Sequence, residues 1–189
     1  MRRFGIPMSR ARFRETYSPD WRSRYRELGI PEDGWEEASR LWSSGMLAAR
    51  PRAFPWVRRA VRSLSRRGVR IALVTASDRT FVERGMPALN LAGAFEHVVC
   101  AEDVDRQKPH PEGLHLALDA LGVDAPDAVY VGDTITDLEM ARAAGVTFVP
   151  IGGTTPDDAF HARDARPVWP SVVAWADHIL GNETPPGAP

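Results

Sequence analysis

The stretch Ala128-Val129-Tyr130-Val131-Gly132-Asp133-Thr134-Ile135-Thr136-Asp137 decides the fold. Its first four residues form an apolar run that predicts a buried β-strand, which ends at Gly132-Asp133. A helix is predicted to follow from Thr134 to Ala144, where Gly145 closes it. A strand that leads directly into a helix is the repeating unit of a parallel α/β sheet. Ligands bind such sheets at the carboxyl ends of the strands, where Asp133 lies.

The same alternation extends to both sides of this stretch. Apolar residues at helical spacing predict a helix that begins near Trp56 and ends before Gly68. The other predicted elements are a strand over residues 69–74, a helix over 79–89, a strand over 97–100, a helix over 112–121 and a strand over 147–151. We therefore expect an α/β fold with a doubly wound, Rossmann-like parallel sheet and helices on both faces.

The sequence predicts three regions along the chain. The sequence pattern of residues 1–53 predicts helices joined by polar turns and contains no convincing strand. We expect this region to form a small helical domain. Residues 54–180 should form the α/β core, which the chain enters through a Pro-containing linker near residues 50–55. Residues 181–189 are polar and rich in Pro, and we expect them to form a disordered tail.

The composition is that of a soluble globular protein, with 43% hydrophobic and 26% charged residues among 189. No apolar run approaches the ~18 residues of a membrane span, so we expect no membrane partner. Basic residues near Met1 are not followed by an apolar stretch, which argues against a signal peptide. Cys100 is the single cysteine, so neither an intrachain disulfide nor a cysteine metal cluster can form. The expected location is the cytoplasm.

The charge is distributed unevenly. Residues 1–70 hold 17 Arg and 7 acidic residues, whereas residues 71–189 hold 7 basic and 18 acidic residues. A basic half is compatible with binding to nucleic acid. The arginines are scattered among aromatic and acidic residues without a groove-reading motif, so we favour a solvated helical surface that faces anionic small molecules.

Lys108 is the only lysine among 24 basic residues. Lysine carries a compact point charge on a thin stem, whereas arginine is a wide planar fork. The segment Lys108-Pro109-His110-Pro111 precedes a predicted helix, and its prolines restrict the loop. A rigid loop could hold this ammonium where it neutralises a phosphate. The alternative is a surface lysine in a Pro-rich turn.

The segment Val74-Thr75-Ala76-Ser77 ends a predicted strand and leads into a helix. A hydroxyl group and free backbone N–H groups at such a junction can bind an oxyanion or a phosphate. Thr and Ser are also ordinary helix-capping residues, so this segment alone is a weak signal.

Asp133 and Asp137 are two carboxylates four residues apart at the predicted turn from strand to helix. A few hard oxygen ligands, with retained water, suit Mg²⁺. Capping of the helix N-terminus is the alternative role, because negative charge is favourable there. The preceding apolar strand favours the metal site.

Together these segments resemble the haloacid dehalogenase-like hydrolase superfamily. The resemblance rests on residues 73–77, 101–104, 108–111, 131–134 with Asp137, and 143–146, and it covers roughly residues 54–180. Residues 1–53 resemble, more loosely, the helical cap of the subgroup that includes phosphoglycolate phosphatase-like and β-phosphoglucomutase-like members.

This resemblance implies a Mg²⁺-dependent phosphatase that hydrolyses a small phosphate monoester through an aspartyl-phosphate intermediate. Thr75 and the Ala76 amide would bind the phosphoryl group, and Lys108 would stabilise its negative charge. Asp133 and Asp137 would form the metal site. Asp133 would bind Mg²⁺ directly, and Asp137 would orient Lys108 or a metal-bound water.

The sequence departs from the family pattern at its start. Members of the family begin with an apolar strand that ends in Asp-x-Asp, and the first of these aspartates is the nucleophile. None of the early acidic residues here follows an apolar run, and the nearest candidate, Asp20, lies in a polar stretch. In the family this strand lies between the strands that end at Thr75 and Asp133, so we expect the first core strand to be missing.

A missing central strand would affect stability as well as chemistry. Neighbouring strands lie ~4.7–4.9 Å apart, so the loss of one separates the two flanking strands and leaves two unpaired edges. Each buried unpaired backbone group costs about 1–3 kcal/mol. Several such groups would offset a typical stability of roughly 5–15 kcal/mol. We expect the chain alone to be unstable, to re-pair its sheet, or to borrow a strand.

Three interpretations remain open at this point. The favoured one is a phosphatase that lacks its N-terminus, so that the chain as written is inactive. The second is a non-catalytic relative that binds phosphate and Mg²⁺ or has a regulatory role. The third is a nucleic-acid-associated protein, for which binding should weaken steeply with salt. The sequence indicates neither the phosphate ester nor the oligomeric state.

Overall fold

The computed structural model describes residues 4–7, 9, 21–48 and 56–182. The chain forms two compact units, Met1–Pro51 and Arg52–Pro189. The sequence places this boundary after residue 53. The predicted linker at residues 50–55 lies outside the described residues, as does the predicted tail beyond residue 182.

The first unit is helical in its described part. It contains α2 (Trp21–Glu27), the 3-10 helix η2 (Glu32–Gly34) and α3 (Trp35–Ala48). The buried residues at its centre are Ile6, Tyr25, Leu28, Ile30 and Ala38. The Trp35 indole packs against this cluster and donates a hydrogen bond from Nε1 to Ile30 O at 3.0 Å, which fixes the turn before α3.

The second unit alternates strands and helices, as the sequence predicts. Its elements are α4 (Val57–Arg66), β1 (Ala72–Val74), α5 (Arg79–Ala88), β2 (His97–Val99), η3 (Ala101–Asp103), α6 (Glu112–Leu121), η4 (Ala125–Asp127), β3 (Val129–Gly132), α7 (Ile135–Ala143), β4 (Thr147–Pro150), α8 (Asp157–His161) and α9 (Val172–Leu180). The strand predicted over residues 69–74 begins only at Ala72. Gly68 has a positive φ of 80° and Val69 is 44% exposed, so the preceding turn extends further than the apolar run suggests.

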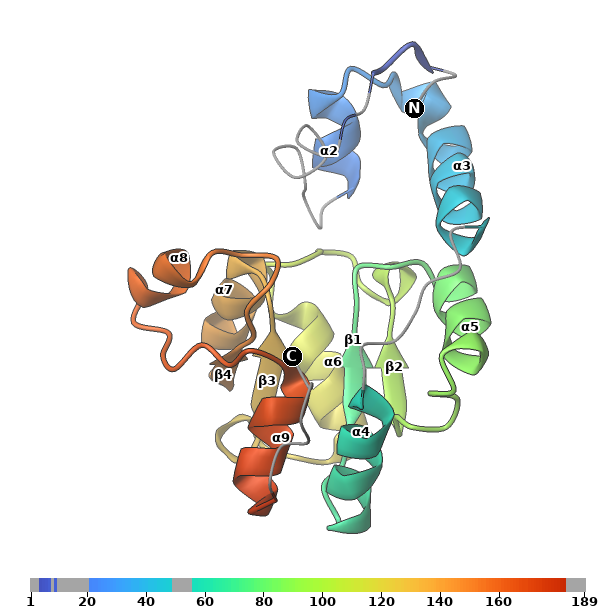
Figure 1. The fold of residues 1–189 in the computed structure, drawn as a ribbon. Coiled ribbons are helices and arrows are strands. Elements are labelled where there is room, and N and C mark those ends of the chain that lie inside the picture. Colours follow the sequence, from blue (N-terminus) through green and yellow to red (C-terminus); the bar gives the residue numbers. More distant parts are fainter. Residues whose placement is uncertain (1–3, 8, 10–20, 49–55, 183–189) are drawn as a thin grey trace. The chain divides into compact units, whose positions relative to one another are not determined.

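The strands form two separate parallel pairs instead of the single sheet that the alternation predicts. β1 pairs with β2 in the register Leu73↔Val98, and β3 pairs with β4 in the register Val131↔Val149. No strand lies between the two pairs in the described part of the chain. Figure 1 shows α6 behind the strands and α4 with α9 in front of them, so helices cover both faces.

Three clusters of buried residues hold the second unit together. α6 and α7 pack over the strands through Leu114, Met140 and Ala141. Phe160 of α8 is completely buried beside Leu138. α4 and α9 form the third cluster, and the side chains of Arg59 and Asp177 link these two helices with an ion pair of 3.0 Å. Among the described residues, no helix is both long enough and apolar enough to cross a lipid bilayer.

Candidate active site

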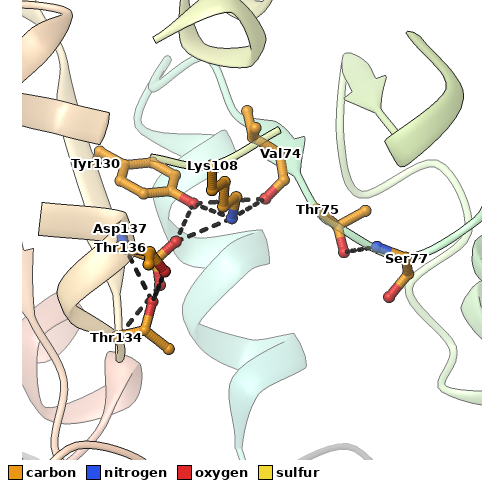
Figure 2. Close-up of polar contacts among 8 residues, drawn as sticks. All are labelled: Val74, Thr75, Ser77, Lys108, Tyr130, Thr134, Thr136 and Asp137. Carbon is orange, nitrogen blue, oxygen red and sulfur yellow. Dashed lines mark hydrogen bonds and ion pairs between the residues drawn. The ribbon is translucent and has the colours of Figure 1, made fainter. Parts of the chain in front are cut away.

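Lys108 connects the carboxyl ends of the two strand pairs. Its ammonium group donates hydrogen bonds to Val74 O at the end of β1 (3.1 Å), to Tyr130 Oη of β3 (2.7 Å) and to Asp137 Oδ1 at the start of α7 (2.9 Å) (Figure 2). The Lys108 and Asp137 side chains are only 13% and 7% exposed. An ammonium has three N–H bonds, and all three are used here.

The loop that carries Lys108 is anchored at the start of α6. The carboxylate of Glu112 accepts hydrogen bonds from the backbone N–H groups of Asp105 (2.7 Å) and Arg106 (3.1 Å). These two bonds hold the pKa of the Glu112 carboxyl below its ordinary value, and the Asp105 bond makes the larger contribution. These bonds tie the loop residues that precede Lys108 to the first residue of α6. The Lys108 ammonium therefore has a defined position.

Asp137 is held by four hydrogen bonds. Oδ1 accepts from Lys108 (2.9 Å) and from Tyr130 Oη (3.0 Å). Oδ2 accepts from the backbone N–H (3.2 Å) and the hydroxyl (2.6 Å) of Thr134. Thr134 Oγ1 in turn accepts from Asp137 N at 3.2 Å, so the two residues form a capping box at the start of α7.

The balance of interactions keeps Asp137 ionised. Burial raises the pKa of its carboxyl, but the charge of Lys108 and the hydrogen bonds from Thr134, Lys108 and Tyr130 together outweigh burial. The pKa therefore lies below the ordinary value of 3.8. In direct contact, the buried carboxylate and the buried ammonium each compensate the charge of the other. Both groups can therefore remain ionised although little solvent reaches them.

This lowered pKa predicts a pH dependence of stability. The folded protein holds Asp137 ionised at lower pH than the unfolded chain does, so its stabilising effect is complete above about pH 4 and is lost as the pH falls through the folded pKa. The free energy of unfolding of the wild type should therefore decrease more on acidification than that of Asp137→Asn. Urea denaturation at a series of acidic pH values measures this difference, and parallel curves for the two proteins would contradict it.

Gly132 makes room for the Asp137 side chain. A Cβ atom added at Gly132 would lie 2.7 Å from Asp137 Cβ and 2.9 Å from Asp137 Cγ. We expect Gly132→Ala to lower the free energy of unfolding by about 1–3 kcal/mol, because a carboxylate held by its surroundings would have to move. Gly85→Ala in α5 is the control, since its added Cβ meets nothing within 4 Å. It should be neutral or stabilising by up to ~1 kcal/mol, and similar losses in both variants would exclude the clash.

Thr75 and Ala76, the predicted phosphate-binding residues, lie at the end of β1 next to Val74. Thr75 Oγ1 accepts a hydrogen bond from Ser77 N at 3.1 Å, which forms a tight turn before α5 (Figure 2). Thr75 directly follows Val74, whose backbone carbonyl accepts a hydrogen bond from Lys108. The structure gives no direct contact between Thr75 and Lys108, so their joint action on a phosphate stays a prediction.

Asp133, the predicted metal ligand, lies one residue after the end of β3. One of its carboxylate oxygens accepts a hydrogen bond from the Thr154 hydroxyl, and the side chain is partly exposed. A carboxylate in this state can still bind a cation that keeps most of its water, as Mg²⁺ does. The four donors on Asp137 occupy its oxygens, which favours its predicted role in orienting Lys108. The described residues contain no group of three or more His, Cys, Asp or Glu side chains placed to hold a metal ion.

Tyr130 is part of this site, although the sequence does not single it out. Its position in an apolar strand predicts a core residue. The signal that could have found it is chemical, because a buried tyrosine hydroxyl needs a hydrogen-bond partner. Tyr130 Oη contacts both Lys108 and Asp137. It therefore completes the set of groups that fix the ion pair.

The model of the family described as haloacid dehalogenase-like hydrolase matches residues 1–151, which include the first unit. The chain belongs to the haloacid dehalogenase-like hydrolase family. The resemblance drawn from the sequence motifs is thus confirmed.

Phosphatases are among the curated relatives of this chain. The chain is 42% identical over 82 residues to pyrophosphatase PpaX of Bacillus pumilus, a match that covers 43% of this chain and 38% of the relative. It is 35% identical over 92 residues to phosphoglycolate phosphatase of Escherichia coli, with coverage of 49% and 36%. The matched segment therefore spans less than two fifths of each of these relatives.

Two solved structures share the fold of this chain. A hydrolase from Pseudomonas syringae has a TM-score of 0.81 at 20% identity, and the alignment covers 95% of this chain and 86% of that one. A protein described as a haloacid dehalogenase-like hydrolase from Bacteroides fragilis has a TM-score of 0.76 at 27% identity, with coverage of 85% and 80%. The α/β, Rossmann-like fold expected from the sequence is confirmed by these neighbours.

Proposed function

We propose that this chain provides the phosphate-binding and Mg²⁺-binding residues of a phosphatase that acts on a small phosphate monoester. The observation that carries the proposal is the buried Lys108–Asp137 ion pair of 2.9 Å at the carboxyl ends of β1 and β3. Ligands bind parallel α/β sheets at this edge. Phosphatases among the curated relatives support the substrate class.

Lys108 is the residue that would neutralise the phosphate. Its three N–H bonds are all in use, so one acceptor must be exchanged when a phosphate oxygen arrives. Val74 O, at 3.1 Å, is the most distant of the three acceptors and the neutral carbonyl among them. Exchange of this contact would leave the bonds to Tyr130 and Asp137 in place, so that both residues continue to aim the ammonium.

The remaining roles follow from position. Thr75 and the Ala76 amide, at the end of β1, would bind the phosphate oxygens. Asp133 would hold Mg²⁺, with Asp137 behind Lys108 as the orienting carboxylate. Bound Mg²⁺ would supply positive charge to the phosphoryl oxygens. The hydrolysis itself would proceed through an aspartyl-phosphate, for which these 189 residues contain no aspartate after an apolar strand at the required place.

We therefore propose that these 189 residues bind phosphate and Mg²⁺ but do not turn over phosphate esters on their own. The buried Cys100, the single cysteine, supports a reducing cytoplasmic setting. Non-catalytic binding of phosphate is the second candidate function, and it rests on the same ion pair. The two candidates differ in whether a nucleophilic aspartate from another segment ever joins the site.

Isothermal titration with orthophosphate in the presence of Mg²⁺ tests the proposal. We expect binding that Mg²⁺ strengthens in the wild type, and we expect Asp133→Asn to remove the Mg²⁺ effect. Thr154→Val is the matched control, since it removes the hydroxyl partner of Asp133 without removing the carboxylate. Absence of phosphate binding would overturn the proposal. Mg²⁺-dependent hydrolysis of an aryl phosphate, abolished by Asp133→Asn, would show that the chain is itself an enzyme.

A further inference from the structure

The second unit begins with a stretch that is basic throughout. Residues 52–77 contain seven arginines and no acidic residue. Most of these arginines belong to α4 or to the turn that follows it. On α9, the helix that packs beside α4, the only acidic residue is Asp177, which is 3% exposed and pairs with Arg59. No exposed carboxylate of α4 or α9 therefore compensates this positive charge.

α4 carries a row of arginines along its outer side. Arg58, Arg62 and Arg66 are exposed, and their spacing of four residues places them above one another on one side of the helix. The apolar residues that α4 buries point the opposite way and pack against α9 and Ile71. We call Arg58, Arg62 and Arg66 the arginine row.

The charge of the arginine row is not neutralised within the described part of the chain. None of its three guanidinium groups forms an ion pair or a hydrogen bond with a described residue. By contrast, Arg59 and Arg70 of the same basic stretch pair with Asp177 and Glu96. Like charges four residues apart on a helix repel each other, so the row destabilises α4 on its own. Its N–H donors are available for an external anion.

Exposed apolar side chains lie at both ends of the arginine row. Trp56 is 49% exposed where α4 begins, and Val69 is 44% exposed in the turn after α4. Ile179, in the last turn of α9, is 50% exposed. α4 and α9 lie side by side in front of the strands (Figure 1). One face of the second unit, which we call the α4–α9 face, thus combines cationic and apolar side chains.

This combination fits the surface of an anionic lipid bilayer. Guanidinium groups bind lipid phosphates, and apolar side chains enter the boundary between the headgroups and the acyl chains. Single-stranded nucleic acid would also attract the arginines, but its bases stack on aromatic side chains. Val69 and Ile179 are aliphatic and cannot stack in this way. The exposed apolar residues therefore favour lipid over nucleic acid.

We propose that the α4–α9 face binds peripherally to membranes that contain anionic phospholipids. The arginine row contacts the headgroup phosphates, and Trp56, Val69 and Ile179 contact the outer part of the acyl region. Such a protein lies on the bilayer and does not cross it, which agrees with the lack of a membrane-spanning helix among the described residues. The expectation of no membrane partner rests on the lack of a spanning run alone, and peripheral binding replaces it. The face is separate from the Lys108 site, so its binding does not depend on the proposed phosphatase function.

Co-sedimentation of the whole chain with phospholipid vesicles tests this proposal. Vesicles of phosphatidylglycerol and phosphatidylcholine in equal amounts are compared with vesicles of phosphatidylcholine alone. The wild type should bind only the anionic vesicles, and added salt should weaken the binding because it screens the charges. Replacement of all three arginines of the row by Gln should lower the affinity by on the order of a hundredfold, since each basic residue near an anionic membrane contributes about fivefold.

Two matched triple variants separate the arginine row from the charge of the whole chain. Replacement of the row by three Lys residues keeps the charge, so this variant should bind nearly as well as the wild type. Replacement of Arg84, Arg163 and Arg166 by Gln removes the same charge from exposed positions on other elements, and this variant should also keep its affinity. Urea denaturation of each variant verifies that it is folded.

The apolar side chains are tested by a double variant, Val69→Ser with Ile179→Ser. It should bind the anionic vesicles about tenfold more weakly, because less apolar surface leaves water on binding. A single-stranded oligonucleotide, titrated in parallel, should bind more weakly than the anionic vesicles. The proposal is overturned if the wild type does not bind anionic vesicles, if it binds neutral vesicles equally well, if the Gln variant of the row binds like the wild type, or if the oligonucleotide binds more tightly than the vesicles.

Discussion

Lys108→Met is expected to lower the free energy of unfolding by about 3–5 kcal/mol at neutral pH. The substitution keeps a long unbranched side chain but removes its charged ammonium group. Asp137, which is 7% exposed, would then hold a buried negative charge without a cationic partner. Urea denaturation measures the loss of stability, and orthophosphate titration of the same variant should show no binding.

The matched control for Lys108→Met is Arg106→Met, two residues away in the same loop. Arg106 forms a looser ion pair of 3.7 Å with Glu112, and its side chain is 70% exposed. Exposed pairs contribute about 0–1 kcal/mol, so this variant should be nearly neutral. Lys108→Arg extends the test, because the wide guanidinium should not restore the three contacts of the ammonium. Equal losses for the exposed and the buried pair would refute the importance of the Lys108–Asp137 contact.

Phe160→Ala is expected to destabilise the second unit by about 3–5 kcal/mol. Phe160 is fully buried in α8, where it packs with Leu138 and Ala165, and its ring centroid lies 6.0 Å from that of Phe148. Truncation to alanine removes this apolar contact and leaves a cavity that the rigid neighbours cannot fill. A loss of this size is a large part of a typical stability of roughly 5–15 kcal/mol.

Ile179→Ala in α9 provides the comparison, because Ile179 is 50% exposed. Substitutions at such positions usually change stability by less than about 0.5 kcal/mol. Thermal unfolding of both variants under the same conditions measures the difference. A small effect of Phe160→Ala would mean that α8 does not contribute to the cooperative core.

The alternation of strands and helices could be predicted because it depends on local patterns. The helix over residues 112–121 is one example, since its apolar face and the closing Gly122 are visible in the sequence, and Gly122 has a positive φ of 59° in the structure. The start of β1 was predicted three residues too early. Val69 and Ile71 are apolar enough to suggest a strand, but only pairing with β2 decides where the strand begins. Such pairing is a long-range property that no local pattern contains.

The candidate site can be predicted only in part, because some of its contacts are long-range and do not follow from local sequence patterns. Lys108 and Asp137 stand out by composition and position, and the structure brings them into contact. Tyr130 could not be found from strand periodicity, because its hydroxyl reaches the end of a different strand across a separation of 56 residues. The roles of Thr75 and Asp133 stay predictions, since they depend on ligands that these side chains would bind.

The contact between α4 and α9 has a consequence for how the protein is made. Arg59 and Asp177, which form the ion pair between these helices, are 118 residues apart in the chain. A ribosome adds residues one after another, so α4 emerges long before its partner exists. The apolar side of α4 must remain uncovered during that interval, and the second unit cannot close until α9 has left the ribosome. Translation speed and chaperone access over this interval should therefore influence the yield of folded protein more than they do for a chain whose neighbouring helices follow each other directly.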